Sequence, residues 1–318
     1  VFVDCLKHMR FATDVPELRA IVLRALSERW ARPEKLIGPA AELAKRNPVV
    51  AACVDRVAKA WPARLTGDDL WSPAQQSALC GDPLLRALLE TAPVCDLDLE
   101  RFLTTARFAL LAQMRTAMPG RADEATLAFH CALARQCFIN EYIFAYEDDE
   151  IEEAKGFTQS LGEAIAASGD LPPLWLAGVG CYAPLHALSG SAALLEKTWP
   201  AAVEQLLIQQ VKEPLEEARD RASIPALTAI EDSVSLAVKE QYEENPYPRW
   251  IDAPAAATFD TFESYLRAAL PFADIRGGSA SCDILVAGCG TGQHAIDVAQ
   301  RSKDARVLAI DLSLASLS

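Results

Sequence analysis

Three glycines at alternate positions, Gly288, Gly290 and Gly292, follow the short apolar run CDILVA near the C-terminal end of the chain. Glycine lets a backbone approach a ligand closely, and the first turn of a following helix offers free N–H groups. A second apolar run, over 307–310, ends at Asp311. A carboxylate at the end of the second strand suits two ribose hydroxyls. These residue types at this spacing predict a nucleotide site.

Three elements must position these residues. The run over 284–287 is short, continuous and rich in branched side chains, which predicts a buried strand, and the second apolar run predicts another. Between the two runs, Ala295, Val298 and Ala299 recur at helical spacing and predict a helix with these residues facing inward. We expect the two strands to be neighbours in a parallel sheet, with the carboxylate aimed at the glycine turn.

The spacing of the glycines discriminates between classes of nucleotide. A dinucleotide fingerprint, G-x-G-x-x-G, would require glycine at position 293, where the chain has Gln293. The phosphate-binding pattern G-x-x-x-x-G-K-[ST] does not occur in the sequence. The spacing G-x-G-x-G instead resembles motif I of the class I S-adenosylmethionine (SAM)-dependent methyltransferases, and Asp311 lies 19 positions past Gly292, where that family has its ribose-binding acid.

The resemblance implies SAM as the cofactor and a Rossmann-like α/β fold. One position departs from the family, because many members have an acid two residues before the first glycine and this chain has Val286. The role of that acid toward the methionine end of the cofactor must then be filled from elsewhere. The cofactor-binding residues that we expect are Gly288, Cys289, Gly290, Thr291, Gly292, Asp311 and Leu312.

A proline-aromatic segment, QYEENPYPRW over 241–250, precedes the glycine motif. Its two prolines end the preceding helix and hold their neighbours extended, so the aromatic side chains are presented from a stiff backbone. Such a segment could cover a flat cofactor ring, or it could be an interdomain strap that packs its aromatics on the surface. The candidate lid residues are Tyr242, Tyr247, Arg249 and Trp250.

This segment widens the resemblance to bacterial methyltransferases that carry tetratricopeptide repeats upstream, and the segment CALARQCFINEY over 131–142 is similar to their intervening helical region. Only the glycine motif and the proline-aromatic segment are specific. The family analogy places the acceptor site and any general base beyond Ser318, so no catalytic residue is named. We therefore expect a fragment that is inactive alone and whose SAM binding is weak or absent, with an unknown methyl acceptor, either a protein or a small molecule.

Helical periodicity dominates the chain before the glycine motif, without the fixed period of a repeat array. Pro48 should open a helix, and short helices are predicted near 73–80 and 83–91. A later helix should carry a core stripe that includes Leu127, Cys131 and Ala134. We expect the helix that opens at Pro173 to reach about Leu188, and Pro214 to interrupt the one that follows.

We expect an irregular α-helical domain over 1–225 and a helix with the proline-aromatic linker or lid over 226–257. The N-terminal part of the methyltransferase domain follows over 258–318, and its first helix should border the cofactor pocket. The predicted fold is thus mainly α, followed by the first β-α-β part of a Rossmann-like domain.

Composition limits the partners. The 318 residues carry a net charge of −14, which disfavours nucleic acid and anionic membranes. No apolar run is long enough for a membrane span, and nine scattered cysteines fit reduced thiols in a cytoplasmic protein. We predict no metal site, and interpret the acidic run over 147–153 as a solvated helix start. His130 and His186 are interpreted as core or boundary residues.

Two other functions stay open. A different nucleotide enzyme, such as a dehydrogenase, could use the same half-unit, although Gln293 argues against it. Alternatively, the helical domain is the working part and binds a protein partner, and the α/β unit is degenerate. Val286 favours that second alternative.

Overall fold

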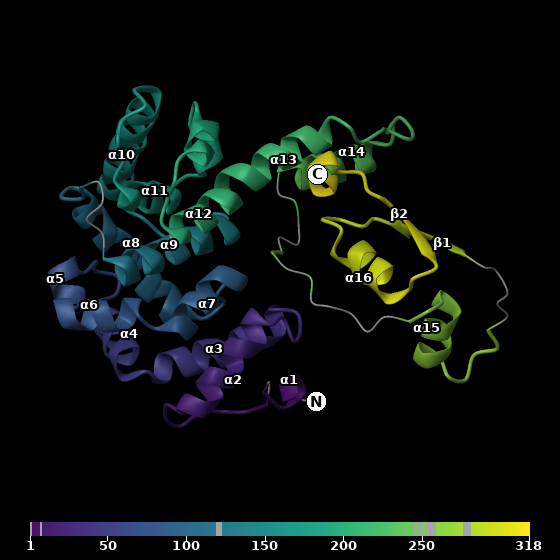
Figure 1. Ribbon diagram of the computed structural model, residues 1–318, viewed down its shortest axis with the longest axis horizontal. Helices are drawn as coiled ribbons and strands as arrows, with labels where there is room; N and C mark the ends of the chain where they lie inside the picture. The colour runs from purple at the N-terminus through teal and green to yellow at the C-terminus, as the bar shows by residue number, and fades with distance from the viewer. Residues whose placement is uncertain are drawn as a thin grey trace. The chain divides into compact units, whose positions relative to one another are not determined.

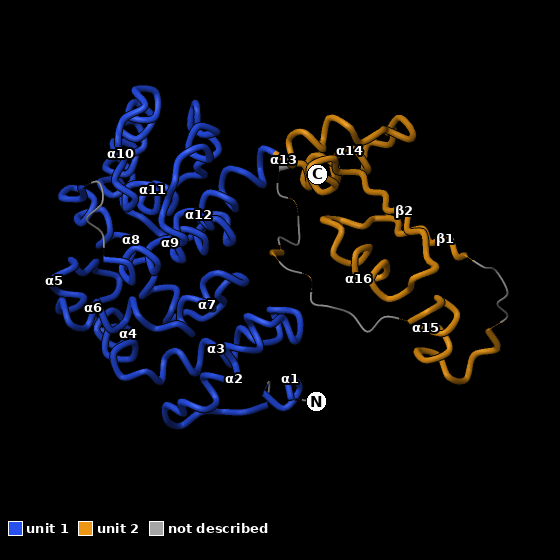
Figure 2. Tube along the Cα trace, viewed as in Figure 1, with its two compact units in different colours: residues 1–215 blue, residues 216–318 orange. Residues whose placement is uncertain are grey.

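A computed structural model describes the chain except residues 1, 7, 119–122, 245, 247–249, 252, 254–258 and 276–280. The chain divides into two compact units, residues 1–215 (unit 1) and residues 216–318 (unit 2) (Figure 2). The described residues are mainly helical, as predicted, with one parallel sheet of two strands. None of the helices described is long and apolar enough to cross a membrane.

Unit 1 consists of helices joined by short loops (Figure 1). The helix α13 (Glu213–Arg221) crosses the boundary between the units. The other elements are α1 (Phe2–Leu6), α2 (Pro16–Ser27), α3 (Glu34–Arg46), α4 (Pro48–Ala60), α5 (Gly67–Leu70), α6 (Pro73–Cys80), α7 (Pro83–Thr91), α8 (Leu97–Met114), α9 (Glu124–Ile139), α10 (Asp148–Ala166), α11 (Pro173–Gly180), the 3-10 turns η1 (Leu185–Ala187) and η2 (Ser191–Glu196), α12 (Ala201–Leu207) and the π-helical turn η3 (Ile208–Lys212).

Proline and a polar cap set the starts of several helices. Asn47, Ser72 and Asp82 each accept a hydrogen bond from a backbone N–H in the first turn of α4, α6 and α7, and each is followed by proline. Proline suits this position because its missing N–H would have had no partner in the helix. The sequence-predicted helices that open at Pro48, Pro73 and Pro83 are confirmed for this reason.

The core of unit 1 surrounds α9, which packs against α6, α7, α11 and α12. Leu127, Cys131 and Ala134 of its predicted inward stripe are buried, and so are Phe129 and Leu133 on its other sides. A helix that is apolar all round belongs at the centre of a helical domain.

Two predicted helix boundaries in unit 1 are wrong. The helix that opens at Pro173 ends at Gly180 rather than near 188. Pro214 does not interrupt the helical chain, because it lies in the first turn of α13 and the π-helical turn η3 joins α12 to α13. The carbonyl oxygen of Gln210, four residues before Pro214, lies 3.3 Å from His186 Nδ1, so it has a contact in place of the N–H that proline lacks.

Unit 2 contains α14 (Ser233–Glu244), α15 (Phe262–Ala269), β1 (Cys282–Ala287), α16 (Gln293–Arg301), β2 (Ala305–Ile310) and α17 (Leu314–Leu317). The strands β1 and β2 pair in parallel, in a register that runs from Cys282 opposite Ala305 to Ala287 opposite Ile310. The prediction of two neighbouring parallel strands joined by a helix is therefore confirmed.

The two faces of this sheet differ. On one face Val286 packs with Cys289 and with Ala295 of α16 in a small buried cluster. On the other face, Leu285 and Leu308 lie opposite each other, and their exposed fractions are 61% and 59%. Ala299 was predicted to face inward, but it is exposed. Fewer residues of α16 therefore face the sheet than the spacing of its apolar residues indicates.

The position of α15 differs from the expectation that it borders the cofactor pocket. The backbone N–H of Phe259 donates to the carbonyl of Arg301 (2.7 Å), and that of Phe262 donates to the Asp304 carboxylate (2.8 Å). Arg301 is the last residue of α16 and Asp304 lies in the connection before β2, so both acceptors are at the amino end of the sheet. The glycine turn lies at the carboxyl end, so these contacts attach the start of α15 to the opposite edge.

Candidate functional site

The turn after β1 needs its glycines. Gly288, Gly290 and Gly292 have φ angles of +66°, +54° and +81°, in the left-handed region that side chains disfavour. The N–H groups of Gly288 and Cys289 donate to the carbonyl of Ile310 (2.9 and 3.1 Å), which ties the turn to the end of β2. A Cβ atom at Gly288 or Gly292 would meet no described atom within 4 Å, so there is space for a ligand beside the backbone.

The carboxylate of Asp311 points at this turn. Its Oδ2 accepts a hydrogen bond from the N–H of Gly290 (2.8 Å), and its Oδ1 accepts one from the N–H of Ser313 (3.0 Å). Each carboxylate oxygen can accept a second hydrogen bond. Asp311 therefore joins the loops that follow β1 and β2 and keeps acceptor capacity for hydroxyl groups, as the sequence analysis required.

The helix α16 opens directly from the turn and has no side-chain cap at Gly292. Its first N–H groups thus lack the cap that Asp82 gives α7. Beside them, the Nε2 atom of Gln293 is buried and has no hydrogen-bond partner among the residues described. The start of α16, which follows the turn that Asp311 contacts, therefore keeps hydrogen-bond donors that no described side chain caps.

The proline-aromatic segment contacts the same edge. The indole N–H of Trp250 donates to the carbonyl oxygen of Thr291 (2.9 Å) and lies 3.1 Å from its Oγ1. The backbone carbonyl of Tyr242, whose side chain is partly exposed, accepts a hydrogen bond from Ser313 Oγ (3.0 Å). Tyr247 and Arg249, the other candidate lid residues, lie outside the described residues. These contacts place Trp250 at the glycine turn and the backbone of Tyr242 at the loop after β2, without choosing between a lid and a strap.

Glu243 is a residue of this site that the sequence analysis did not single out. Its Oε1 accepts a hydrogen bond from the N–H of Leu314 (2.5 Å) and its Oε2 one from that of Ala315 (3.2 Å), at the start of α17. A carboxylate is favoured at a helix N-terminus. The pattern Tyr-Glu-Glu before the prolines was the only available signal, and it does not reveal a partner 71 residues further along the chain.

The remaining predicted residues have different surroundings. Leu312 is 41% exposed next to Asp311, so an apolar surface is available there. Burial, with the nearby Asp311 charge, raises the pKa of the Cys289 thiol, which disfavours the reactive thiolate. Val286 is part of the buried cluster under α16, so an acid at this position would be buried in that cluster.

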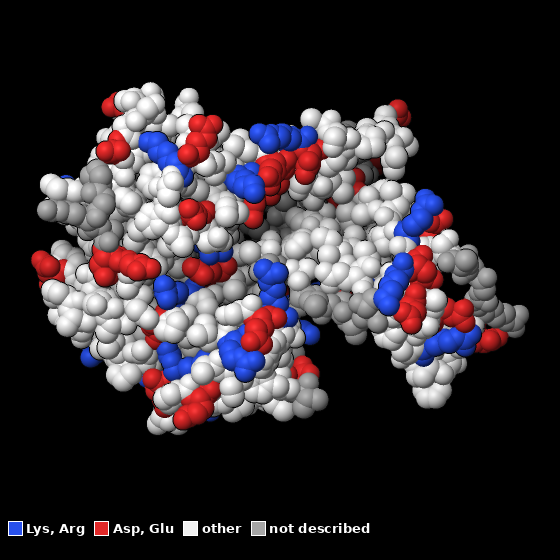
Figure 3. All heavy atoms as spheres, viewed as in Figure 1, with Lys and Arg blue, Asp and Glu red and all other residues white. Residues whose placement is uncertain are grey.

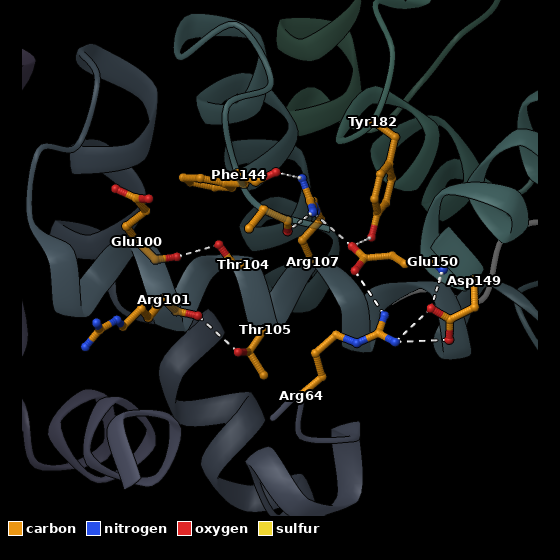
Figure 4. A network of polar contacts seen from close by, with 11 residues as sticks. Arg64, Glu100, Arg101, Thr104, Thr105, Arg107, Phe144, Asp149, Glu150 and Tyr182 are labelled. Carbon is orange, nitrogen blue, oxygen red and sulfur yellow. Dashed lines mark hydrogen bonds and ion pairs between the residues drawn. The ribbon is translucent and has the colours of Figure 1, made fainter. Parts of the chain in front are cut away.

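Unit 1 has a second polar cluster, centred on Glu150 at the start of α10 (Figure 4). Glu150 Oε1 accepts hydrogen bonds from Arg107 (2.9 Å) and from the hydroxyl of Tyr182 (2.6 Å), and its Oε2 accepts one from Arg64 (3.2 Å). The prediction that the run over 147–153 is solvated is wrong at this residue, which is 1% exposed.

The geometry of this cluster is that of a structural ion pair. Arg107 also donates to the carbonyl oxygens of Phe144 (3.4 Å) and Ala145 (2.7 Å), and its guanidinium lies 4.5 Å from the ring centroid of Tyr182. Burial raises the pKa of Tyr182, so its hydroxyl stays protonated and donates. Charges that are compensated and hydrogen-bonded in this way hold α8, α10 and the end of α11 together.

Metal binding and a large charged surface find little support in the residues described. No group of three or more His, Cys, Asp or Glu side chains among them could hold a metal ion. On the face shown in Figure 3, acidic and basic side chains alternate over both units and form no broad patch of one sign. His186 is exposed and is not a core residue, whereas His130 is fully buried.

Comparisons with protein-family models, with curated proteins and with solved structures found no match to this chain.

Proposed function

We propose that unit 2 carries the cofactor half-site of a SAM-dependent methyltransferase. The observation that supports this most is the Asp311 carboxylate, which lies 2.8 Å from the N–H of Gly290 across the ends of two parallel strands. Ligands of open α/β sheets bind at the carboxyl ends of the strands. In this proposal β1, α16 and β2 are the first part of a Rossmann-like domain.

The residues of the turn fit a nucleoside. Asp311 has lone pairs for the two ribose hydroxyls, and the exposed side chain of Leu312 offers an apolar surface for a flat base. The glycines leave room beside the backbone, and the first turn of α16 supplies free N–H groups. SAM would supply an activated methyl group on its sulfonium, and the residues described here would bind and orient the nucleoside.

The wider parts of the proposal rest on the sequence. The methyl acceptor is a protein or a small molecule, and unit 1 is an accessory helical domain open to a protein partner. The cysteine usage favours a cytoplasmic setting. No described residue is assigned to the methyl-transfer step itself, because placement of the acceptor can supply much of such catalysis.

Saturation-transfer difference NMR on the 318-residue chain tests the proposal, because this method detects weak ligands. The probe is S-adenosylhomocysteine, with NAD as the competing nucleotide. We expect saturation of the ribose and adenine protons of S-adenosylhomocysteine, and a loss of affinity of at least about tenfold in Asp311→Ala, the size of a lost hydrogen bond to a charged group. Asp283→Ala is the matched control, because this carboxylate lies at the amino end of β1 and pairs with Arg306.

One observation favours a second candidate function. Val286 is buried in the small cluster under α16, at the position where many methyltransferases of this class have an acid, so β1 supplies no carboxylate there. A helical interaction module with a degenerate α/β unit would have this property. In the same experiment, saturation of neither nucleotide would support this candidate, and saturation of NAD alone would support a dehydrogenase.

A further inference from the structure

We propose that Tyr242, Glu243 and Trp250 form a clasp that controls the nucleoside site by holding its two loops in the binding geometry. The clasp rests on the proposed function, since the regulated site is the one formed by the glycine turn and Asp311. Tyr242 and Glu243 contact the loop after β2, and Trp250 contacts the loop after β1. The three residues are positioning residues.

Glu243 provides the charged contact of the clasp. Its two carboxylate oxygens accept the N–H groups of Leu314 and Ala315, 2.5 and 3.2 Å away, which are among the first free donors of α17. Hydrogen bonds to an ionised acceptor are about twice as strong as neutral ones. The end of α14 is thus attached directly to the loop that carries Asp311.

Ser313 transmits this attachment to Asp311. It is fully buried, its Oγ donates to the Tyr242 carbonyl (3.0 Å), and the same Oγ accepts the N–H of Ser316 (3.1 Å). Its own N–H donates to Asp311 Oδ1 (3.0 Å). A displacement of α14 removes the contacts that hold Ser313, Leu314 and Ala315, so the Ser313 N–H that binds Asp311 Oδ1 loses its support.

Trp250 completes the clasp on the other loop. Its indole N–H donates to the carbonyl of Thr291, the residue between Gly290 and Gly292. The left-handed glycines give this turn little intrinsic preference for one shape, so an external hydrogen bond restricts it. A ligand that needs both loops in place binds more tightly when the clasp is closed, and by linkage the same ligand favours the closed clasp.

Hydrogen exchange resolved to single amides tests the clasp on the full chain without any ligand. We expect the N–H groups of Leu314 and Ala315 to exchange at least about tenfold faster in Glu243→Gln, since one of the two charge-assisted hydrogen bonds is replaced by a donor facing a donor. Glu240→Gln is the matched control, because Glu240 is exposed on the same helix. Trp250→Phe keeps an aromatic ring but removes the indole N–H together with the five-membered ring that carries it, so it should accelerate exchange in the glycine turn.

The regulatory role is tested by titrating S-adenosylhomocysteine into the same variants. We expect weaker binding by both Glu243→Gln and Trp250→Phe, and slower exchange at Leu314 and Ala315 in the wild-type chain when the ligand is present. Unchanged exchange in Glu243→Gln overturns the clasp, and unchanged affinity in both variants overturns its control of the site. If Glu243→Gln changes exchange at Leu314 and Ala315 but the wild-type chain binds no S-adenosylhomocysteine, the proposed function is overturned and the clasp remains as a purely structural contact.

Discussion

Unit 1 and unit 2 use their polar residues in opposite ways. In unit 1 a large apolar core encloses polar side chains such as Glu150 and Gln210, which are hydrogen-bonded to other helices. In unit 2 the buried cluster consists of Val286, Cys289 and Ala295, and the Asp311 carboxylate of the candidate site is hydrogen-bonded at the ends of the strands. Phe272 in the same unit is fully exposed.

This difference assigns the buried polar groups of unit 1 to the stability of the fold and the polar groups of unit 2 to the candidate site. Buried polar side chains that are hydrogen-bonded to other helices, as Glu150 and Gln210 are, fix the packing of those helices and use their acceptors within the fold. Polar groups at strand ends keep such capacity, and a two-stranded sheet contributes little stability of its own. We therefore expect the substitutions with the largest effects on folding to lie in unit 1, and those with the largest effects on binding in unit 2.

The largest expected effect follows from the buried Glu150. Glu150→Gln leaves the Arg107 charge buried without its counterion, which should lower the free energy of unfolding by about 3 kcal/mol or more. Glu153→Gln is the control in the same helix, because Glu153 pairs with the exposed Arg115 and should cost about 1 kcal/mol at most. Chemical denaturation of both variants measures the difference. Equal losses would contradict the stabilising role that the comparison gives to buried polar groups in unit 1.

His130 should make the stability of unit 1 depend on pH. Desolvation by burial lowers the pKa of His130 to about 4, against an opposing contact with the backbone of Thr126. The unfolded chain therefore binds a proton more readily, and the free energy of unfolding should fall by about 3 kcal/mol as pH decreases from 6.5 to 4. Denaturation at several pH values would show a shallower slope in His130→Gln than in the wild-type chain, and an unchanged slope in this variant would contradict the prediction.

Gln210 tests whether an uncharged buried polar side chain also stabilises unit 1. Its side chain is fully buried and contacts three backbone groups, the carbonyls of Ala134 and Gly180 and the N–H of Leu185. Gln210→Leu leaves these groups without partners and should lower the free energy of unfolding by about 2 kcal/mol. The control Gln205→Leu, at an exposed position of α12, should stay within about 0.5 kcal/mol. Thermal unfolding distinguishes the two outcomes.

The smallest expected effects lie in the sheet of unit 2. Val286→Ala removes two methyl groups from the buried cluster and should cost about 1.5 kcal/mol, whereas Leu285→Ala on the exposed face should stay within about 0.5 kcal/mol. Hydrogen exchange of the β1 and β2 amides reports both changes. A larger loss at Leu285 would mean that its face is covered in solution, and the contrast between the two faces would then fail.

Local signals predicted the elements that depend only on neighbouring residues. The helices that open at Pro48, Pro73 and Pro83 were predicted because proline and a polar cap act within one turn. Burial of Glu150 was not predicted, because its partners Arg107 and Tyr182 lie 43 and 32 residues away in sequence. For the same reason the contact between Glu243 and Leu314 had no readable signal.

The amino-acid sequence by itself determined the glycine turn, the two strands and the acid at the end of the second, since backbone preference and apolar periodicity are short-range properties. Only the tertiary structure decided that α15 attaches to the far edge of the sheet, and that Glu243 and Trp250 contact the loops of the site. Those contacts depend on which hydrogen-bond donors remain free after each element has formed. Such donors reach acceptors that are distant in sequence only when the chain has folded.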